Sequence, residues 1–172
     1  SYGHGITTTI LQLTNAYSII ANGGYKIEPT LVMKDKYHKG KKILNDNVSK
    51  DIISILRKIV TTKEGTASLA NIDGYEIAGK TGTAQKSTQG GYSRKKINTF
   101  ASIFPASNPK YALIVMLDEP KTNSEYIYNF RDGSNIKYKG TPFNTAGWTT
   151  VEVVGQIIEK IGPILATKYN DG

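Results

Sequence analysis

Three segments of the chain repeat apolar residues at helical spacing, which predicts three amphipathic helices packed on a core. Asn22-Gly23-Gly24 offers a left-handed stop after the first segment, and Asp46 and Asn47 are capping candidates for the second. Gly162-Pro163 is expected to weaken or end the third helix. In chain order, the apolar positions are Ile10, Leu13, Tyr17 and Ile20; then Val48, Ile52, Ile55, Leu56 and Ile59; then Val151, Val154, Ile158, Ile161 and Leu165.

Three other segments have the composition of β-strands: Tyr75 to Gln85, Asn98 to Pro105 and Tyr111 to Leu117. The last is a continuous apolar run, which is typical of a strand covered on both faces. Asn108-Pro109 lies between the last two segments and favours a turn, so these strands are expected to form a hairpin.

Two polar stretches are predicted to be loops. Lys86 to Lys96 contains Gly90-Gly91 and the basic cluster Arg94-Lys95-Lys96. Lys121 to Thr145 is longer and mixes tyrosine, phenylalanine, lysine and arginine, and loops of this length are uncommon without a function. We favour a variable insertion over a surface for a protein partner. A site where the bases of single-stranded nucleic acid stack on aromatic side chains is the least favoured interpretation.

The composition fits one folded domain, because 38% of the 172 residues are hydrophobic and 21% are charged. The longest apolar run is too short to cross a bilayer, so any anchor or targeting segment is expected upstream of Ser1. The absence of cysteine excludes disulfides and thiolate chemistry. The net charge of +8 includes only three arginines, Arg57, Arg94 and Arg131, and phosphate recognition favours arginine, so no specific nucleic-acid site is expected.

The stretch Gly74 to Thr81 satisfies the letters of a phosphate-binding loop, G-x-x-x-x-G-K-[ST], and Leu113 to Glu119 has the form of the acidic strand that accompanies such a loop. The physical context argues against a nucleotide site. Thr66 to Asp73 is too polar for the buried strand that precedes a phosphate-binding loop, and Gly82 to Lys96 has no apolar stripe for the helix that follows it. The loop interior, Tyr75 to Ala78, is also too bulky to wrap a phosphate.

We instead interpret Lys80-Thr81-Gly82-Thr83 as part of a strand that binds substrate. Lys80 supplies an ammonium group for a substrate carboxylate, and the hydroxyls of Thr81 and Thr83 can hydrogen-bond the same carboxylate. Gly82 has no side chain, so an extended substrate can lie against the strand as an added neighbour. The backbone N–H of Thr83 is then a candidate donor to the oxyanion of a tetrahedral intermediate.

A Lys-Thr-Gly strand is the third motif of serine acyl-transferases such as penicillin-binding proteins and class A β-lactamases, and the flanking residues make the resemblance specific. Gly65-Thr66-Ala67, Gly74-Tyr75 and Ala78 to Gln85 resemble the class B penicillin-binding proteins, above all the cell-division (septal) D,D-transpeptidases. The resemblance spans nearly the whole chain, since further similar stretches are Tyr2-Gly3-His4-Gly5, Leu11-Gln12-Leu13, Phe104-Pro105-Ala106 and Gly147 to Ile158.

The resemblance implies that residues 1–172 are the C-terminal portion of a single transpeptidase domain. The implied fold is the α+β fold of penicillin-binding proteins and β-lactamases, with an antiparallel sheet flanked by helices. The implied reaction is serine attack on the D-Ala-D-Ala end of a peptidoglycan stem peptide and acyl transfer to a neighbouring stem, with β-lactams as inhibitors. The resemblance also implies partners among the membrane proteins of the divisome and a periplasmic position on the bacterial inner membrane, with the anchor outside this chain. It implies no cofactor.

The resemblance assigns no catalytic residue to this chain, because the family's S-x-x-K nucleophile motif and S-x-N motif are expected upstream. It makes Lys80 to Thr83 the substrate-carboxylate and oxyanion side of the site. The chain departs from the family in having Ile10 where proline is usual in the first helical turn, and in the greater length of Lys121 to Thr145. S-x-x-K occurs only after the Lys-Thr-Gly strand, in polar stretches that we interpret as coincidences: Ser93/Lys96, Ser107/Lys110 and Ser134/Lys137.

Other polar residues have simpler interpretations. His4 is expected to line the rim of the site rather than act as a base, and His38 is expected to be exposed. Asp118-Glu119 are interpreted as solvated carboxylates at a strand end rather than a catalytic acid pair. Two histidines without cysteine or a carboxylate cluster predict no metal site. The alternatives to a transpeptidase are a β-lactamase-like or β-lactam-sensor protein of the same fold, and a basic, non-enzymatic interaction module.

Overall fold

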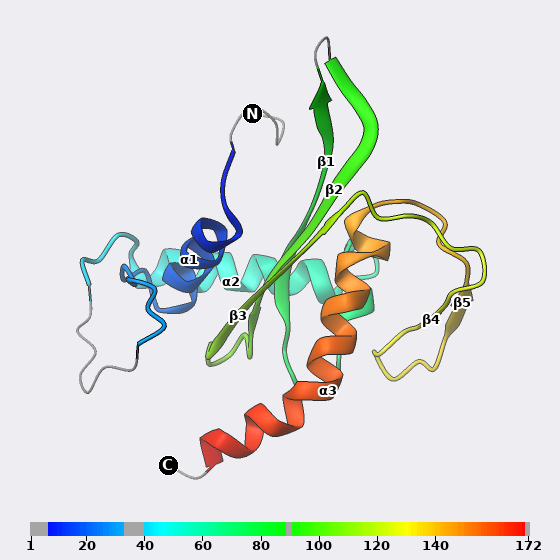
Figure 1. Ribbon diagram of the computed structural model, residues 1–172. Coiled ribbons are helices and arrows are strands. Elements are labelled where there is room, and N and C mark those ends of the chain that lie inside the picture. The colour runs from blue at the N-terminus through cyan, green and yellow to red at the C-terminus, as the bar shows by residue number, and fades with distance from the viewer. Residues whose placement is uncertain (1–6, 33–39, 89–90, 171–172) are drawn as a thin grey trace.

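The computed structural model describes residues 7–32, 40–88 and 91–170 (Figure 1). A three-stranded antiparallel sheet forms its centre, in the order β1 (Ala78–Thr88), β2 (Gly91–Phe104) and β3 (Tyr111–Asp118). Helices α1 (Ile10–Ala21) and α2 (Asp46–Thr61) cover one face of the sheet, and α3 (Thr150–Asn170) covers the other. The expected α+β architecture, an antiparallel sheet flanked by helices, is therefore confirmed.

Shorter elements connect these parts. The 3₁₀ helix η1 (Ser68–Ala70) lies between α2 and β1, and η2 (Ala146–Trp148) directly precedes α3. A separate two-stranded sheet of β4 (Ile127–Asn129) and β5 (Lys137–Lys139) lies beyond α3, away from the central sheet. None of the helices in the described ranges is long and apolar enough to cross a membrane.

Two hydrophobic cores lie on opposite faces of the central sheet. Ile53 of α2 packs with Ile103 of β2 in one core, whereas Val154 and Ile158 of α3 pack with Phe100 of β2 in the other. Successive strand residues point to opposite faces, and the odd spacing of Phe100 and Ile103 places one in each core. The alternating apolar residues of β2 thus join both helical layers to one sheet.

The first two helices begin and end close to the predicted positions. α1 starts with a capping box, in which the Thr9 hydroxyl accepts from the Gln12 N–H at 3.1 Å and the Gln12 side chain accepts from the Thr9 N–H at 2.8 Å. Gly24 follows α1 with φ of 87°, and a Cβ there would lie 2.2 Å from the Leu44 carbonyl oxygen. The N-cap of α2 is Asn45, one residue before the predicted candidates.

Helix α3 continues through Gly162-Pro163 to Asn170, so of the two expectations for this pair, that it weakens or ends the helix, the second is wrong. A proline removes one helix hydrogen bond, but packing on both sides of the pair holds the helix to the core. A Cβ at Gly162 would lie 2.3 Å from the ring of Tyr75, which shows how closely that ring packs on the helix. Leu165, after the proline, still packs against the core.

The predicted loop from Lys86 to Lys96 is wrong, because most of it forms the outer part of the β1–β2 hairpin. The hairpin extends beyond the helices that cover the sheet (Figure 1). Among the described residues, no helix covers this outer part, so its strands need no apolar alternation, and such a polar composition is also typical of a loop. β1 also starts at Ala78 rather than Tyr75, because Glu76 has φ of 46° and cannot extend the strand.

The hairpin of β2 and β3 is confirmed, with Phe104 opposite Tyr111 at its turn. The predicted coverage of β3 on both faces holds only in part. Helices α1 and α3 pack on its two faces, but most of its side chains are half-buried and Met116 is 42% exposed. The strand is the second edge of this sheet, which explains the incomplete burial.

Candidate functional site

Lys80 to Thr83 lie within β1, as predicted, and β1 continues as a strand to Thr88. No helix follows Gly79-Lys80-Thr81, so the geometry of a phosphate-binding loop is absent at this place and the nucleotide interpretation is excluded. Asp118, the acid that a nucleotide site would need, instead forms an ion pair with Lys86 at 2.6 Å.

The outer edge of β1 has no neighbouring strand among the described residues. Alternate residues of β2 direct their backbone groups to opposite neighbours. The carbonyl of Lys96 accepts from the Glu119 N–H at 2.9 Å, and that of Phe104 accepts from the Lys110 N–H at 3.2 Å. The even-numbered residues of β2 therefore face β3, and the odd-numbered residues face β1.

This alternation defines which backbone groups of β1 face its open edge. Lys80 lies opposite Ala101 and Gly82 lies opposite Thr99, so these pairs occupy the hydrogen-bonded positions of the ladder. The residues between and beyond them, Thr81 and Thr83, direct their N–H and C=O groups to the open edge. An extended peptide that added to this edge would meet two donors and two acceptors at strand spacing.

The side chains of the strand project on both sides of this edge. Lys80 is exposed, and its ammonium group donates to the Thr81 carbonyl at 2.8 Å. The Thr81 and Thr66 hydroxyls lie 2.8 Å apart, and the Thr83 hydroxyl accepts from the Ala146 N–H at 3.0 Å. The structure thus places the ammonium group and both hydroxyls along one short stretch of an open strand.

Two glycines of this strand differ in their surroundings. A Cβ at Gly79 would lie 2.6 Å from the Phe100 ring and 2.7 Å from the Ala101 carbonyl oxygen, so Gly79 is required for packing. A Cβ at Gly82 would meet nothing closer than Thr99 at 3.9 Å. Packing therefore leaves position 82 free, and the absence of a side chain there opens one side of the strand edge.

Sequence reasoning missed the residues that hold the two hydroxyls. Thr66 belongs to a stretch singled out only for its resemblance, Asn144 lies at the end of the predicted loop and Ala146 directly follows that loop. Asn98 connects β2 to this segment, because its amide Nδ2 donates to Asn144 Oδ1 at 3.1 Å. Asn98 is fully buried, but Thr99 and Ser102 of the same strand are also polar, so no sequence signal distinguishes Asn98 from them.

The long segment from Lys121 to Thr145 is anchored on α3 rather than free. Arg131 contacts Glu152 at 2.7 Å and Glu159 at 2.8 Å, and the side chains of Arg131 and Glu152 are each only 6% exposed. Burial alone raises the pKa of Glu152, but hydrogen bonds from Arg131 and Tyr126 outweigh it and leave the pKa below its ordinary value. Burial and the bond to Glu152 raise the pKa of Tyr126 to about 12.

The aromatic residues of this segment mostly face inward. The Tyr128 ring packs edge-on against Trp148 at 5.0 Å and against Tyr126 at 4.7 Å, and Tyr128 is 3% exposed. These rings serve the core and are not available to stack nucleic-acid bases. The stacking interpretation is therefore wrong for Tyr126 and Tyr128, whereas Tyr138 and Phe143 are exposed.

The other residues weighed as possible catalytic or metal-binding groups show no arrangement of an active site in the described part of the chain. Glu119 forms ion pairs with Lys86 at 2.8 Å and Lys95 at 3.1 Å, and these bonds lower its pKa. None of the three S-x-x-K pairs lies in a helix. His4 and His38, with the resembling stretch Tyr2 to Gly5, fall outside the described residues. Within the described ranges, no group of three acidic or histidine side chains could hold a metal ion.

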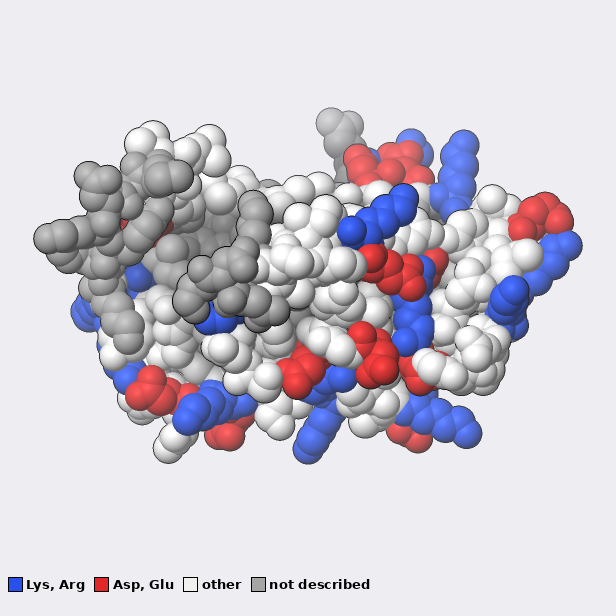
Figure 2. Space-filling view, turned by 90° about the horizontal axis from the view of Figure 1, so that it is seen from below, with Lys and Arg blue, Asp and Glu red and all other residues white. Residues whose placement is uncertain are grey.

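Charges of both signs are mixed on the surface. On the face that Figure 2 shows, lysine and arginine side chains lie beside aspartate and glutamate, and they do not form one continuous basic area. Ion pairs such as Lys139–Glu125 at 2.8 Å and Lys42–Asp46 at 2.7 Å contribute to this mixing.

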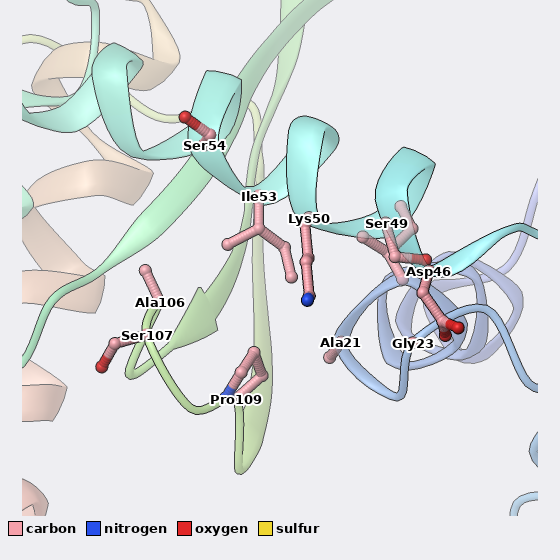
Figure 3. A pocket seen from close by; sticks show the side chains of 11 residues that line it. Ala21, Gly23, Asp46, Ser49, Lys50, Ile53, Ser54, Ala106, Ser107 and Pro109 are labelled. Atoms are coloured by element: carbon pink, nitrogen blue, oxygen red, sulfur yellow. The ribbon is translucent and has the colours of Figure 1, made fainter.

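A cavity of about 610 Å³ lies between α1, α2 and the turn that joins β2 to β3 (Figure 3). Lys50 points into it, and apolar side chains such as Ile53 form part of its wall. None of Lys80 to Thr83 lines this cavity. The full lining is Ile20, Ala21, Gly23, Asp46, Ser49, Lys50, Ile53, Ser54, Ala106, Ser107 and Pro109.

Solved structures share this fold. The transpeptidase domain of penicillin-binding protein 3 from Burkholderia pseudomallei superposes with a TM-score of 0.74 at 24% identity, over 94% of this chain and 44% of that one. Penicillin-binding protein 3 from Mycobacterium tuberculosis, solved in complex with aztreonam, superposes with a TM-score of 0.67 at 26% identity, over 92% of this chain and 36% of that one.

Sequence comparison agrees. The chain is 34% identical to the peptidoglycan D,D-transpeptidase FtsI homolog of Mesostigma viride, over 97% of this chain and 30% of the relative. It is 37% identical to peptidoglycan D,D-transpeptidase FtsI of Buchnera aphidicola subsp. Schizaphis graminum, over 73% of this chain and 22% of the relative. The chain thus spans less than a third of the length of these relatives. Residues 1–133 match the family model described as penicillin binding protein transpeptidase domain, and the chain belongs to that family.

Proposed function

We propose that the chain is the C-terminal portion, residues 1–172, of the single transpeptidase domain of a serine D,D-transpeptidase. The enzyme cross-links peptidoglycan stem peptides at the division septum and is acylated by β-lactams. The observation that carries the proposal is the open edge of β1, where the backbone groups of Thr81 and Thr83 point away from the sheet beside the Lys80 ammonium group.

The strand suits the D-Ala-D-Ala end of a stem peptide. An extended peptide adds to the open edge by main-chain hydrogen bonds, and Gly82 leaves room for it. Its terminal carboxylate meets Lys80 and the hydroxyls of Thr81 and Thr83, while the Thr83 N–H donates to the oxyanion that forms when the scissile carbonyl is attacked. Penicillins such as ampicillin carry a similar carboxylate beside a reactive carbonyl, and penicillin-binding protein 3 from Mycobacterium tuberculosis was solved in complex with ampicillin and with aztreonam.

The nucleophile is assigned to a part of the protein upstream of this chain. Acyl transfer needs a serine activated by a base within hydrogen-bond reach. The relatives are more than three times as long as the matched region, which leaves ample chain for a serine motif. The same upstream part would supply the anchor on the periplasmic face of the inner membrane, and divisome membrane proteins would be the partners.

Penicillin labelling tests the proposal. The 172-residue chain should show no covalent adduct with a fluorescent penicillin by intact mass spectrometry, whereas a version extended upstream to the S-x-x-K serine should gain one penicillin per chain. A stoichiometric adduct on the short chain at Ser93, Ser107 or Ser134 would contradict the assignment of the nucleophile. An extended protein that takes up no penicillin would favour a non-enzymatic module, and one that then hydrolyses the adduct quickly would favour a β-lactamase.

A further inference from the structure

Thr81 and Thr83 point to the same side of β1, but their hydroxyls are held differently. The Ala146 N–H donates to Thr83 Oγ1 at 3.0 Å. A backbone N–H can only donate, so the threonine oxygen is the acceptor and its own hydrogen stays available for a ligand. The Thr81 hydroxyl instead contacts the Thr66 hydroxyl at 2.8 Å, where either oxygen can be the donor. Only the Thr83 contact therefore fixes that the threonine oxygen is the acceptor.

Asn98 and Asn144 hold the segment that carries the Ala146 N–H. We call these two residues the asparagine bridge. Asn98 lies directly opposite Thr83 on β2. Its Nδ2 donates to Asn144 Oδ1 at 3.1 Å and to Thr149 Oγ1 at 2.9 Å, on the two sides of Ala146. The bridge therefore ties both flanks of Ala146 to the strand position that faces Thr83.

Further contacts fix Asn144 itself. Lys96 Nζ donates to the Asn144 carbonyl at 3.0 Å, and the Asn144 side-chain amide donates to the carbonyl of Pro120. The far part of the loop is anchored separately, because Arg131 forms ion pairs with Glu152 and Glu159 of α3. Loss of the bridge would therefore free the segment next to Thr83 without releasing the whole loop.

Stability alone explains the bridge poorly. Asn98 is fully buried, and its Oδ1 has no hydrogen-bond partner among the described atoms. A buried oxygen without a partner costs free energy that an apolar side chain at this position would avoid. The two bonds that Asn98 donates, both directed at the segment around Ala146, account for an amide at this place.

We propose that Asn98 and Asn144 are positioning residues that hold the Ala146 N–H against Thr83 Oγ1. The Thr83 hydroxyl then presents its hydrogen to a carboxylate bound along the open edge of β1. Neither asparagine touches the substrate. The proposal rests on the proposed function of this edge, because the carboxylate belongs to the stem peptide or the β-lactam.

Amide hydrogen exchange tests the contact without any activity. In the 172-residue chain, Thr83→Val removes the acceptor at nearly constant volume and should speed exchange of the Ala146 N–H about tenfold, relative to the Phe100 amide as a reporter of global unfolding. Asn144→Ala should act in the same direction, and the matched variant Thr81→Val should leave Ala146 unchanged. Equal exchange at Ala146 in Thr83→Val and the unchanged protein would overturn the proposal.

Acylation tests the consequence in the version that carries the upstream serine. Asn144→Ala should slow acylation by a penicillin about tenfold, and Asn144→Asp, which keeps the acceptor for Asn98, should restore most of the rate. The exposed Asn129→Ala in the same loop is the control. With the methyl ester of the same penicillin, which lacks the carboxylate, Asn144→Ala and the unchanged protein should react at equal rates.

The two proposals fail in different ways. If Asn144→Ala slows the acid and the ester equally, or slows neither, the positioning role is wrong although the enzyme is a transpeptidase. If the unchanged extended protein takes up no penicillin at all, the proposed function is wrong, and the exchange of Ala146 in Asn144→Ala still decides whether the bridge holds the Ala146 N–H against Thr83.

Discussion

The open edge of β1 and the segment from Lys121 to Thr145, which is anchored on α3, each carry a cationic side chain, but the two side chains lie in opposite surroundings. Arg131 of the loop is 6% exposed and lies between two carboxylates, Glu152 and Glu159. Lys80 of the strand is exposed, and its ammonium group donates to the carbonyl of Thr81. A charge that is buried and paired serves the fold, whereas a charge left open at a strand edge is available to a ligand.

Arg131→Ala should cause the largest loss of stability. The substitution leaves the buried carboxylate of Glu152 without its cation, and breaking such a pair from one side typically costs about 3–5 kcal/mol. The free energy of unfolding, measured by urea denaturation, should fall by that amount. The matched variant is Lys139→Ala, whose partner Glu125 is 75% exposed, and its cost should be about 0–1 kcal/mol. Equal losses in the two variants would mean that burial does not distinguish the two regions.

The two glycines of β1 allow the same contrast within one strand. Gly79→Ala should cost about 1–3 kcal/mol, because the added Cβ would lie 2.6 Å from the Phe100 ring. Gly82→Ala should change stability by only about 0.5 kcal/mol, since nothing lies within 3.9 Å of its Cβ. In the extended protein, however, Gly82→Ala should slow acylation, because the methyl group obstructs the strand edge. A Gly82→Ala variant that acylates at the normal rate would show that substrate does not lie against this strand.

The strand could be predicted from sequence because its determinants are local. Lys80 to Thr83 combine residues that favour extended structure with a glycine that a helix would disfavour, and the segment that follows has no helical stripe. The partners of its hydroxyls could not be found in this way. Thr66 is 15 residues from Thr81, and Ala146 is 63 residues from Thr83, so only the folded chain brings them together.

The errors in the predicted elements have a related cause. Apolar periodicity detects elements that pack on a core, and no described helix covers the outer part of the β1–β2 hairpin, so the sequence pattern predicts a loop over Lys86 to Lys96. Proline and glycine at positions 162–163 predict a helix end from local preference, but contact between Tyr75 and Gly162 overrides it. The segment from Lys121 to Thr145 presents a further difficulty. Its buried ion pair joins Arg131 to Glu152 of α3, a helix that follows it in the chain, and local patterns do not reveal such a contact.

The buried pair of Arg131 and Glu152 should also make the free energy of unfolding depend on pH. The pKa of Glu152 is lowered in the folded protein, despite burial that alone would raise it, because Arg131 and Tyr126 donate to the carboxylate. The unfolded chain then binds the proton at higher pH than the folded chain. The stability from this group is fully present above the unfolded pKa, about 4.3, and is lost as the pH falls through the folded pKa.

Urea denaturation across this range gives the measurement. The free energy of unfolding should decrease on acidification below about pH 4.3, and Glu152→Gln, which cannot titrate, should show a shallower decrease. The variant should be less stable near neutral pH, so the two curves should converge in acid. Parallel curves at all pH values would mean that Glu152 does not contribute through its charge.

Lys80→Ala should have the smallest effect on folding and a clear effect on function. Its ammonium group is exposed and donates to a single carbonyl, that of Thr81, so its removal should change the free energy of unfolding by no more than about 0.5 kcal/mol. A hydrogen bond to a charged group contributes about 1.5–3 kcal/mol, so acylation of the extended protein by penicillin should slow by about ten- to a hundredfold. Lys63→Ala, an exposed lysine after α2, is the control and should change neither quantity. A Lys80→Ala variant that folds less stably but acylates normally would reverse the contrast, because Lys80 would then serve the fold, as Arg131 does.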